Sequence, residues 1–249
     1  MSVYDPIAKQ YQEERYFHIP WFLYIEEPSY FNMLGDITGK SILDIGCGEG
    51  IYARKFKQKG AGRVVAVDIS QGMLTLAKEQ EAKEPLGIEY ILSDMQELGQ
   101  VGSFDLVTAA YSLNHAQTKE QLLAISQTIY TNLKPGGRFV AINNNLDRPL
   151  KSYKFSEEYG YEERISASLE EGKPLPIPRF LYKLDDKTVI IEDYYLSKAT
   201  YEWAFREVGL KEIRWHEQTI SKAGIREFGQ EFWQDYVKYD YMVGIECWK

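Results

Sequence analysis

Short apolar runs alternate with helical patterns along this chain, and that alternation constrains its fold more than any other feature. Five runs are typical of buried strands, at 42–45, 64–67, 88–92, 104–109 and 138–142. Helices are expected between them, over 51–59, 70–81 and about 122–129. Strands that alternate with helices form right-handed βαβ units, so we expect a doubly wound, Rossmann-like α/β fold with a mostly parallel sheet.

The pattern divides the chain into four segments. Residues 1–40 precede the alternation and are expected to form an N-terminal helical lid, and 41–145 form the first part of the α/β core. The alternation stops over 146–193, which is rich in tyrosine, charge and proline, and we interpret it as an inserted substrate-binding lobe. Over 194–249 the alternation resumes, with helices expected at 197–208 and 228–237. Strands expected at 212–215 and 242–248 bring the number of strands in the sheet to seven.

Composition argues against several classes of function. The net charge of −8 disfavours nucleic acid as a partner. The three histidines and two cysteines lack metal-ligand spacing, so no metal is expected. No apolar run reaches the ~18 residues that span a bilayer, and the first ten residues lack a signal layout. We therefore expect a cytoplasmic protein, monomeric or homodimeric, with a small-molecule substrate and no membrane partner.

A glycine-rich loop follows the first predicted strand. Residues 43–50 read L-D-I-G-C-G-E-G and connect a strand to a helix, where glycine allows positive φ and close approach of a ligand. A dinucleotide site would want its third glycine at Ile51, and the carboxylates of Asp44 and Glu49 would repel its pyrophosphate. No G-K-S/T follows, which excludes a P-loop. The loop favours a ligand that carries an ammonium and a sulfonium and no phosphate.

Two further signals stand at strand ends. Asp68 directly follows the second predicted strand, where a carboxylate can accept both hydroxyls of a ribose. Asp94 and Met95 follow the third, where the carboxylate could accept from an adenine amino group while the thioether packs on the ring. Ligands of parallel sheets bind at these carboxyl ends, so the loop and both carboxylates should meet.

Taken in order, these motifs resemble those of the class I S-adenosylmethionine-dependent methyltransferases. The matching stretches cover 41–142 and are the D-I-G-C-G-E-G loop, Asp68, S-D-M at 93–95, F-D-L-V at 104–107 and L-K-P-G-G-R-F at 133–139. The resemblance implies S-adenosylmethionine as cofactor and S-adenosylhomocysteine as product. The whole-chain pattern is most similar to bacterial natural-product N- or O-methyltransferases of the toxoflavin-pathway kind, although those more often have Tyr where His115 stands.

The resemblance also implies roles for individual residues. Gly46, with the adjoining backbone of Cys47 and Gly48, would hold the methionine amino end, and Asp44 would help to orient it or serve only as a structural bond. Asp68 would hold the ribose. Ile69 and Met73 would flank the adenine, and Asp94 with Met95 would complete its pocket. The wall beneath the sulfonium would be lined by Ala109, Ala110 and Tyr111.

Residues 4–11, Y-D-P-I-A-K-Q-Y, resemble the lid motif of small-molecule methyltransferases. Tyr4, Ile7, Ala8 and Tyr11 share one helical face, which could close over the cofactor or simply dock on the domain. Arg15 lies on the same side as Tyr11, and its guanidinium could pair with the methionine carboxylate. Tyr11 is therefore a candidate for both cofactor binding and catalysis.

Substrate contacts are expected from the fourth and fifth strand ends and from the insert. His115 could accept a proton from the acceptor, or it could be a polar loop residue that bonds backbone. Asn143, the first of three asparagines after the fifth strand, could bond a polar substrate or cap the turn. An aromatic wall for a planar or cationic substrate could come from Tyr153, Tyr159, Tyr161, Tyr194 and Tyr195.

The leading hypothesis is methyl transfer to a nitrogen or oxygen of a small molecule in secondary metabolism. Transfer from a sulfonium is an in-line displacement in which the protein aligns the reactants and, where needed, supplies a base. The alternative is an enzyme that keeps the same site but cyclises S-adenosylmethionine and releases methylthioadenosine. A third possibility is a non-catalytic protein that only binds the cofactor.

Overall fold

A computed structural model describes residues 2–16, 20–145, 147, 169–174, 181–184, 187–239 and 241–249. Its main sheet has seven strands in the order β3-β2-β1-β4-β5-β9-β8. The five strands β1 to β5 are parallel, and β9 is antiparallel to both of its neighbours. Their bounds are β1 Ser41–Ile45, β2 Arg63–Asp68, β3 Ile88–Leu92, β4 Phe104–Ala110, β5 Leu133–Asn144, β8 Lys211–His216 and β9 Met242–Trp248. The predicted doubly wound, mostly parallel seven-stranded sheet is confirmed.

Helices cover both faces of the sheet. Those of the core are α3 Ile51–Gln58, α4 Gln71–Lys83, α5 Lys119–Asn132 and α6 Lys198–Glu207, with a short 3₁₀ turn η3 at Leu113–His115. The N-terminal segment holds η1 Asp5–Ile7, α1 Ala8–Tyr16, a π-helix η2 at Phe22–Glu26 and α2 Glu27–Leu34. The C-terminal part adds α7 Lys222–Phe232 and α8 Gln234–Tyr239, and a separate hairpin pairs β6 Leu181–Leu184 with β7 Lys187–Ile190.

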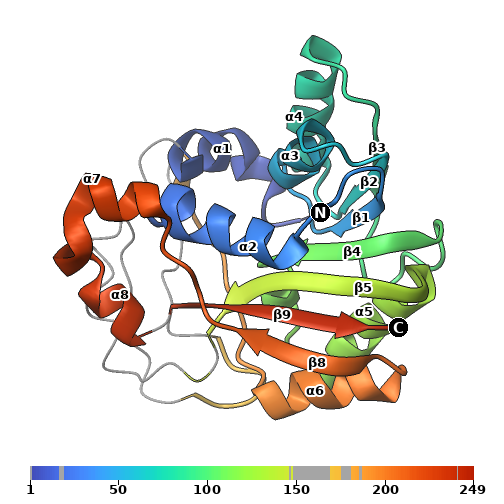
Figure 1. The fold of residues 1–249 in the computed structure, drawn as a ribbon. Helices are drawn as coiled ribbons and strands as arrows, with labels where there is room; N and C mark the ends of the chain where they lie inside the picture. Colours follow the sequence, from blue (N-terminus) through green and yellow to red (C-terminus); the bar gives the residue numbers. More distant parts are fainter. Residues whose placement is uncertain are drawn as a thin grey trace.

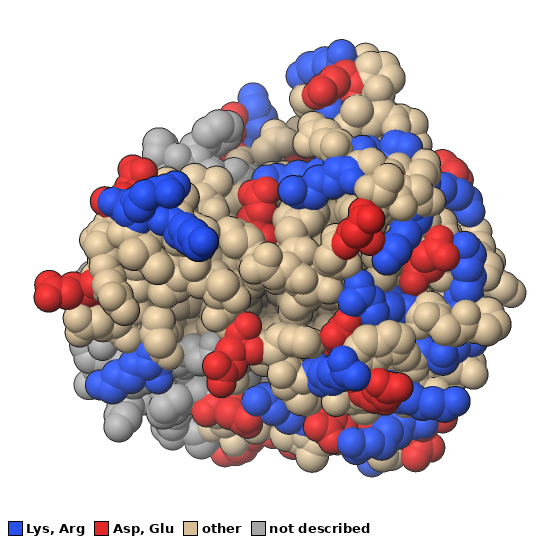
Figure 2. Space-filling model, viewed as in Figure 1, with Lys and Arg blue, Asp and Glu red and all other residues tan. Residues whose placement is uncertain are grey.

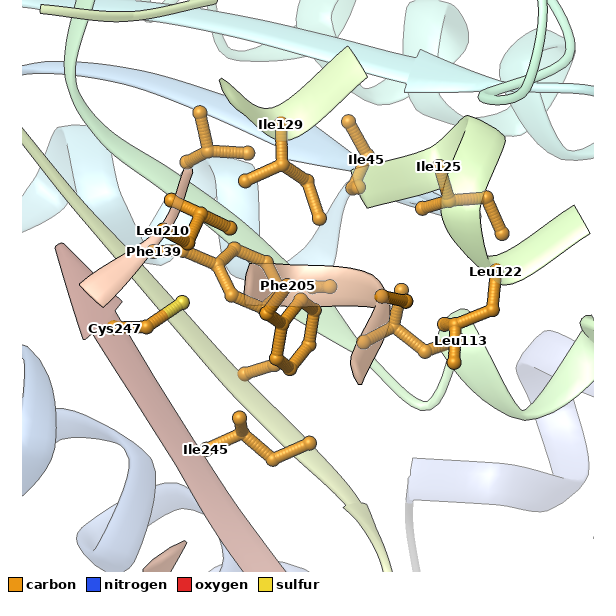
Figure 3. Close-up of a cluster of buried hydrophobic side chains, with 14 of the residues drawn as sticks. Ile45, Leu113, Leu122, Ile125, Ile129, Phe139, Phe205, Leu210, Ile245 and Cys247 are labelled. Carbon is orange, nitrogen blue, oxygen red and sulfur yellow. The ribbon is translucent and has the colours of Figure 1, made fainter. Parts of the chain in front are cut away.

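The alternation of side chains along the strands assigns each residue to one face. Odd-numbered residues such as Leu43, Val65 and Val107 pack with α5 and α6 in one cluster, part of which Figure 3 shows around Phe139 and Phe205. Even-numbered residues such as Ile42 and Val64 pack with α2, α3 and α4 on the other face. Because both faces are covered, the strands read as continuous apolar runs, which is why they were visible in the sequence.

Figure 1 shows where the additional helices lie. Helices α1, α7 and α8 are on the side toward which the arrows of β4 and β5 point, the side of the carboxyl ends. On the face drawn in Figure 2, basic and acidic side chains are interspersed rather than gathered by sign. Within the described ranges, no helix has both the length and the apolarity that crossing a bilayer requires.

The structure differs from the sequence prediction in three places. The single helix expected over 228–237 is interrupted twice: α7 is kinked at Gly229, which has φ 78° and ψ 162°, and α8 begins only at Gln234, after the C-cap of α7 at Trp233. The fifth strand begins at Leu133 rather than at 138. The π-helix η2 was not foreseen. Most of the proposed insert, 146–193, lies outside the described residues, and so do Tyr153, Tyr159 and Tyr161.

Candidate active site

A cavity of about 390 Å³ opens at the carboxyl ends of β1, β2, β3 and β4, within the size range of small-molecule sites. Ten of the residues singled out from the sequence line it together: Tyr11, Gly46, Gly48, Asp68, Ile69, Met73, Asp94, Met95, Tyr111 and His115. These positions span more than 100 residues of sequence. The fold therefore gathers the glycine loop, both strand-end carboxylates, the N-terminal segment and the β4 end around one space.

The glycine loop forms the wall after β1. Gly46 has φ 69°, and a Cβ built on it would lie 2.3 Å from Cβ of Ser112, so only glycine fits there. Gly48 has φ 56°, and a Cβ on it would meet no atom within 4 Å. Gly46 is thus required by packing against the segment after β4, whereas Gly48 leaves room on the cavity side of the loop for a ligand.

Asp68 stands at the centre of the hydrogen bonding around this cavity. Its Oδ2 accepts from the backbone N–H of Gly48 at 2.7 Å, and its Oδ1 accepts from that of Ser70 at 2.8 Å. Burial raises the pKa of the Asp68 carboxyl, and the two backbone donors oppose that shift. A carboxylate offers about four acceptor positions, so both oxygens keep capacity for a further donor in the cavity.

The β2 and β3 ends form the side on which an adenine was expected. Ile69 is 53% exposed at the mouth, whereas Met73 is buried beneath it against Tyr11. Asp94 accepts from the backbone N–H of Gln96 through Oδ1 at 2.8 Å, which fixes its carboxylate in a turn. Met95 packs against the core cluster beside it. This arrangement offers an apolar slot with one carboxylate at its edge.

The N-terminal segment covers the cavity. Asp5 Oδ1 accepts from the Ser70 hydroxyl at 2.7 Å and from the Gly72 backbone N–H at 3.1 Å, at the start of α4. Burial acts to raise the pKa of Asp5, but these donors and the backbone of Ser2 outweigh it, so the pKa is lowered. Tyr4 meets Tyr11 edge-on, with ring centroids 5.4 Å apart. The segment expected as a lid or docking helix is therefore anchored on the same helix that follows Asp68.

His115 lines the cavity on the side where substrate contacts were expected. Its Nε2 lies 3.1 Å from the Tyr4 hydroxyl, and its Nδ1 lies 3.3 Å from both the Glu192 carbonyl oxygen and Oδ1 of Asp193. Tyr111, nearby, takes the left-handed conformation at φ 56°, which is uncommon for an aromatic residue. Its ring contacts Trp21 edge-on at 6.1 Å. Aromatic rings and an imidazole thus surround this end.

Four predicted site residues do not line the cavity, and the side chain of a fifth, Arg15, is not among the described residues. Asp44 is buried, accepts from Oγ1 of Thr108 at 2.9 Å, and has a pKa raised to about 7 by burial. Its charge is therefore only partial at neutral pH, which weakens the electrostatic argument drawn from it against a pyrophosphate. Cys47 lies under the loop in the core cluster on the even-numbered face.

The other three are displaced or undescribed. Ala109 points into the opposite core, and its neighbour Ala110 lines the cavity instead. Asn143 is fully buried and its amide donates to the Tyr201 hydroxyl at 3.0 Å, so it holds β5 to α6 rather than facing the cavity. The backbone of Arg15 lies in α1, but its side chain falls outside the described residues.

Several lining residues were not foreseen: Ser2, Val3, Gln96, Ser112, Ala116, Ile125 and Glu192. Ser112 lies between Tyr111 and His115, and its place two residues after β4 was the available signal. Ser2 and Val3 precede the recognised lid motif. Glu192 and its neighbour Asp193 carried no sequence signal, because only the fold brings them beside His115.

Electrostatics of the cavity distinguish between ligand classes. Among the described lining residues, three are carboxylates, namely Asp68, Asp94 and Glu192, and none is Lys or Arg. Such a lining attracts a cationic ligand and repels a pyrophosphate. The ammonium and sulfonium of S-adenosylmethionine fit it, and the open side of Gly48 provides space for that ligand against the loop. The described residues include no group of three or more side chains placed to hold a metal ion.

Comparison of the sequence with known protein families agrees with the ligand class that this geometry favours. Residues 42–137 match the family model described as a methyltransferase domain. Residues 42–137 thus carry a methyltransferase domain. The match begins in β1 and ends in the turn within β5, so this methyltransferase domain model includes the glycine loop, Asp68, Asp94 and His115.

Relatives of the methyltransferase domain support the same conclusion. The chain is 36% identical over 118 residues to the demethylmenaquinone methyltransferase of Lactococcus lactis, covering 45% of each chain. It is 34% identical over 127 residues to the ubiquinone biosynthesis O-methyltransferase of Acinetobacter baylyi, covering 49% of this chain and 50% of that one. The chain thus spans about half the length of the curated relatives it matches.

A solved structure extends the likeness in fold to nearly the whole chain. The S-adenosylmethionine-dependent methyltransferase from Mesorhizobium loti superposes with a TM-score of 0.63 at 23% identity, covering 90% of this chain and 97% of that one. At this identity the likeness concerns the fold alone. Because it covers 90% of this chain, it extends beyond the residues 42–137 that the family model matches.

Proposed function

We propose that this protein transfers a methyl group from S-adenosylmethionine to an oxygen or nitrogen of a small-molecule acceptor. One observation carries the proposal: the glycine loop, Asp68 and Asp94 line a single cavity whose described charged residues are all acidic. The curated O-methyltransferase relative favours oxygen as the acceptor atom. Secondary metabolism, a cytoplasmic location, a monomer or homodimer, and the absence of a nucleic-acid or membrane partner remain parts of this proposal.

The cofactor, when bound, supplies a methyl group on a sulfonium whose sulfur leaves as a neutral thioether. The chain's own residues position it. The backbone of Gly46 and Gly48 accommodates the methionine end, and Asp68 receives the ribose hydroxyls through the acceptor capacity left by its two backbone donors. Ile69 and Met73 cover one side of the adenine, and Asp94 accepts from its amino group.

The acceptor side is assigned to the residues around His115. The Tyr4, Tyr11 and Tyr111 rings exclude water from the reacting atoms and orient a planar acceptor. His115 removes the proton that the acceptor's nucleophilic atom carries. Tyr194, the one member of the expected aromatic wall that is described in the cavity lining, stands beside Glu192.

Calorimetry with three ligands tests this function. S-adenosylmethionine and S-adenosylhomocysteine should bind, whereas NAD⁺ should not, because its pyrophosphate meets the carboxylates of the cavity. Binding of NAD⁺ without binding of S-adenosylmethionine would overturn the proposal. Mass spectrometry of the product then separates the alternatives: S-adenosylhomocysteine with a methylated acceptor supports transfer, and methylthioadenosine supports cyclisation.

A further inference from the structure

The imidazole of His115 is contacted at both ring nitrogens by residues from distant parts of the chain. On one side, Nδ1 lies 3.3 Å from the Glu192 carbonyl oxygen and 3.3 Å from Oδ1 of Asp193. On the other, Nε2 lies 3.1 Å from the Tyr4 hydroxyl. The ring belongs to η3, after β4, and it is about one-third exposed toward the cavity. His115 thus lies between a fixed acidic side and the covering segment.

The chemistry of these partners decides which nitrogen carries the proton. A carbonyl oxygen and a carboxylate oxygen can only accept, so the shared nitrogen Nδ1 must donate. In a neutral imidazole the other nitrogen then holds the lone pair. Nε2 therefore accepts from the Tyr4 hydroxyl, and it is the atom that faces the cavity as a base.

Asp193 is itself held from its far side. The amide of Asn144, at the end of β5, donates to Oδ2 of Asp193 at 3.1 Å, leaving Oδ1 for the imidazole. The Asp193 side chain is 17% exposed, so water competes little for it. Asn144, Asp193, His115 and Tyr4 thus form a continuous polar chain from a sheet strand to the N-terminal segment.

We propose that Asp193 is a positioning residue for the methyl-transfer step: it fixes His115 in the Nδ1–H tautomer, so that Nε2 receives the acceptor's proton. The Tyr4 hydroxyl occupies the place that the acceptor's O–H or N–H takes in the reacting complex. This inference rests on the proposed function, because it assigns the base of that same site.

The step balances in atoms and charge. The nucleophilic atom of the acceptor forms a bond to the methyl carbon while the carbon–sulfur bond breaks, and the electron pair of that bond stays on sulfur. The acceptor's proton passes to Nε2, which leaves an imidazolium that donates from both nitrogens. The carboxylate of Asp193 provides negative charge beside it. The extra proton then returns to solvent.

The tautomer can be measured directly by long-range ¹H–¹⁵N correlation spectra of the labelled full-length protein at about pH 8, above the ordinary imidazole pKa of about 6.5. The His115 signals are assigned by their loss in His115→Gln. Wild-type protein should show Nδ1 protonated and Nε2 bare. In Asp193→Asn the amide can donate to Nδ1, so the two nitrogen signals should move toward each other as the Nδ1–H form loses population.

Matched variants separate positioning from a structural effect. Asp147→Asn removes the same charge from an exposed carboxylate paired with Lys198 and should leave the His115 signals unchanged. Tyr4→Phe should keep Nδ1 protonated, because the partners on that side remain. A proton on Nε2 in the wild type, or unmoved signals in Asp193→Asn, would overturn the inference. Calorimetry with S-adenosylmethionine tests the proposed function separately, and its affinity should be the same in Asp193→Asn as in wild type.

Discussion

The backbone N–H of Gly48 donates a hydrogen bond of 2.7 Å to Oδ2 of Asp68, which ties the loop after β1 to the end of β2. The carboxylate that sequence reasoning reserved for a ribose therefore also shapes the glycine loop. Ligand binding and loop geometry therefore depend on the same side chain. The other oxygen of Asp68, Oδ1, accepts from the backbone N–H of Ser70.

Replacing Asp68 with Asn should weaken S-adenosylmethionine binding about tenfold or more. A charge-assisted hydrogen bond contributes roughly 1.5–3 kcal/mol, and a carboxamide presents a donor where the site needs an acceptor. Calorimetry measures the change in affinity. Glu89→Gln, which removes from β3 an exposed carboxylate paired with Arg63 of β2, serves as the control and should bind as wild type does. Equal affinities in the two variants would refute the ribose assignment.

Gly46→Ala and Gly48→Ala should affect the protein differently, the first mainly its stability and the second mainly its ligand binding. At Gly46 the new methyl would overlap Cβ of Ser112, so the free energy of unfolding should fall well beyond the roughly 1–2 kcal/mol that the left-handed backbone costs. At Gly48 no atom stands in the way, so stability should fall by that backbone cost alone while the methyl intrudes on the ligand's space. Urea unfolding and calorimetry together test the contrast, and equal stability losses would contradict it.

Asp5→Ala should release the N-terminal segment from α4 without unfolding the core. Its carboxylate is the acceptor for the Ser70 hydroxyl and the Gly72 backbone N–H. Hydrogen exchange should accelerate over residues 2–16 and stay unchanged in β1, β4 and β5. Glu13→Gln, which removes a surface carboxylate paired with Lys9, is the control within the same segment. Unchanged exchange in Asp5→Ala would show that apolar contacts alone hold the segment.

The anchored segment should also respond to acid. The pKa of Asp5 is lowered in the folded protein, so its contribution is present above the ordinary carboxyl pKa of about 3.9 and is lost as the pH falls through the lowered value. As the pH falls through the lowered pKa of Asp5, hydrogen exchange over residues 2–16 should therefore lose protection in wild type. In Asp5→Ala, which lacks this carboxyl, protection should not change with its titration.

The sequence was sufficient to predict the parts of the fold that depend on short-range patterns. The run at 64–67 and the helical pattern over 70–81 predicted β2 and α4 correctly, because burial on both faces and helical periodicity leave local signatures. It failed where the backbone of single residues decides: within the helix expected over 228–237, Gly229 kinks α7 and Trp233 ends it.

In the candidate site, the residues of the motifs could be predicted from the sequence, whereas their contact partners could not. Asp68 and Gly48 were identified because each follows a strand in a recognisable spacing. Asn143 was misplaced, since a strand's last residues alternate between the faces and only packing against Tyr201 shows which way its amide points. Asp193 could not be foreseen, because nothing local distinguishes it from the other carboxylates of its segment.

Asp44 should make the stability of the protein depend on pH near neutrality. Burial raises its pKa to about 7, so the neutral form is favoured by folding. Stability linked to this group is fully present below the unfolded pKa of about 3.9 and is lost as the pH rises through 7. Asp44→Asn, which keeps an acceptor for Thr108, should therefore gain stability relative to wild type between about pH 4 and pH 7, by up to roughly 4 kcal/mol. Above pH 7 the difference should level off. Urea unfolding of both proteins across this range measures it, and a constant difference would show that Asp44 is ionised throughout.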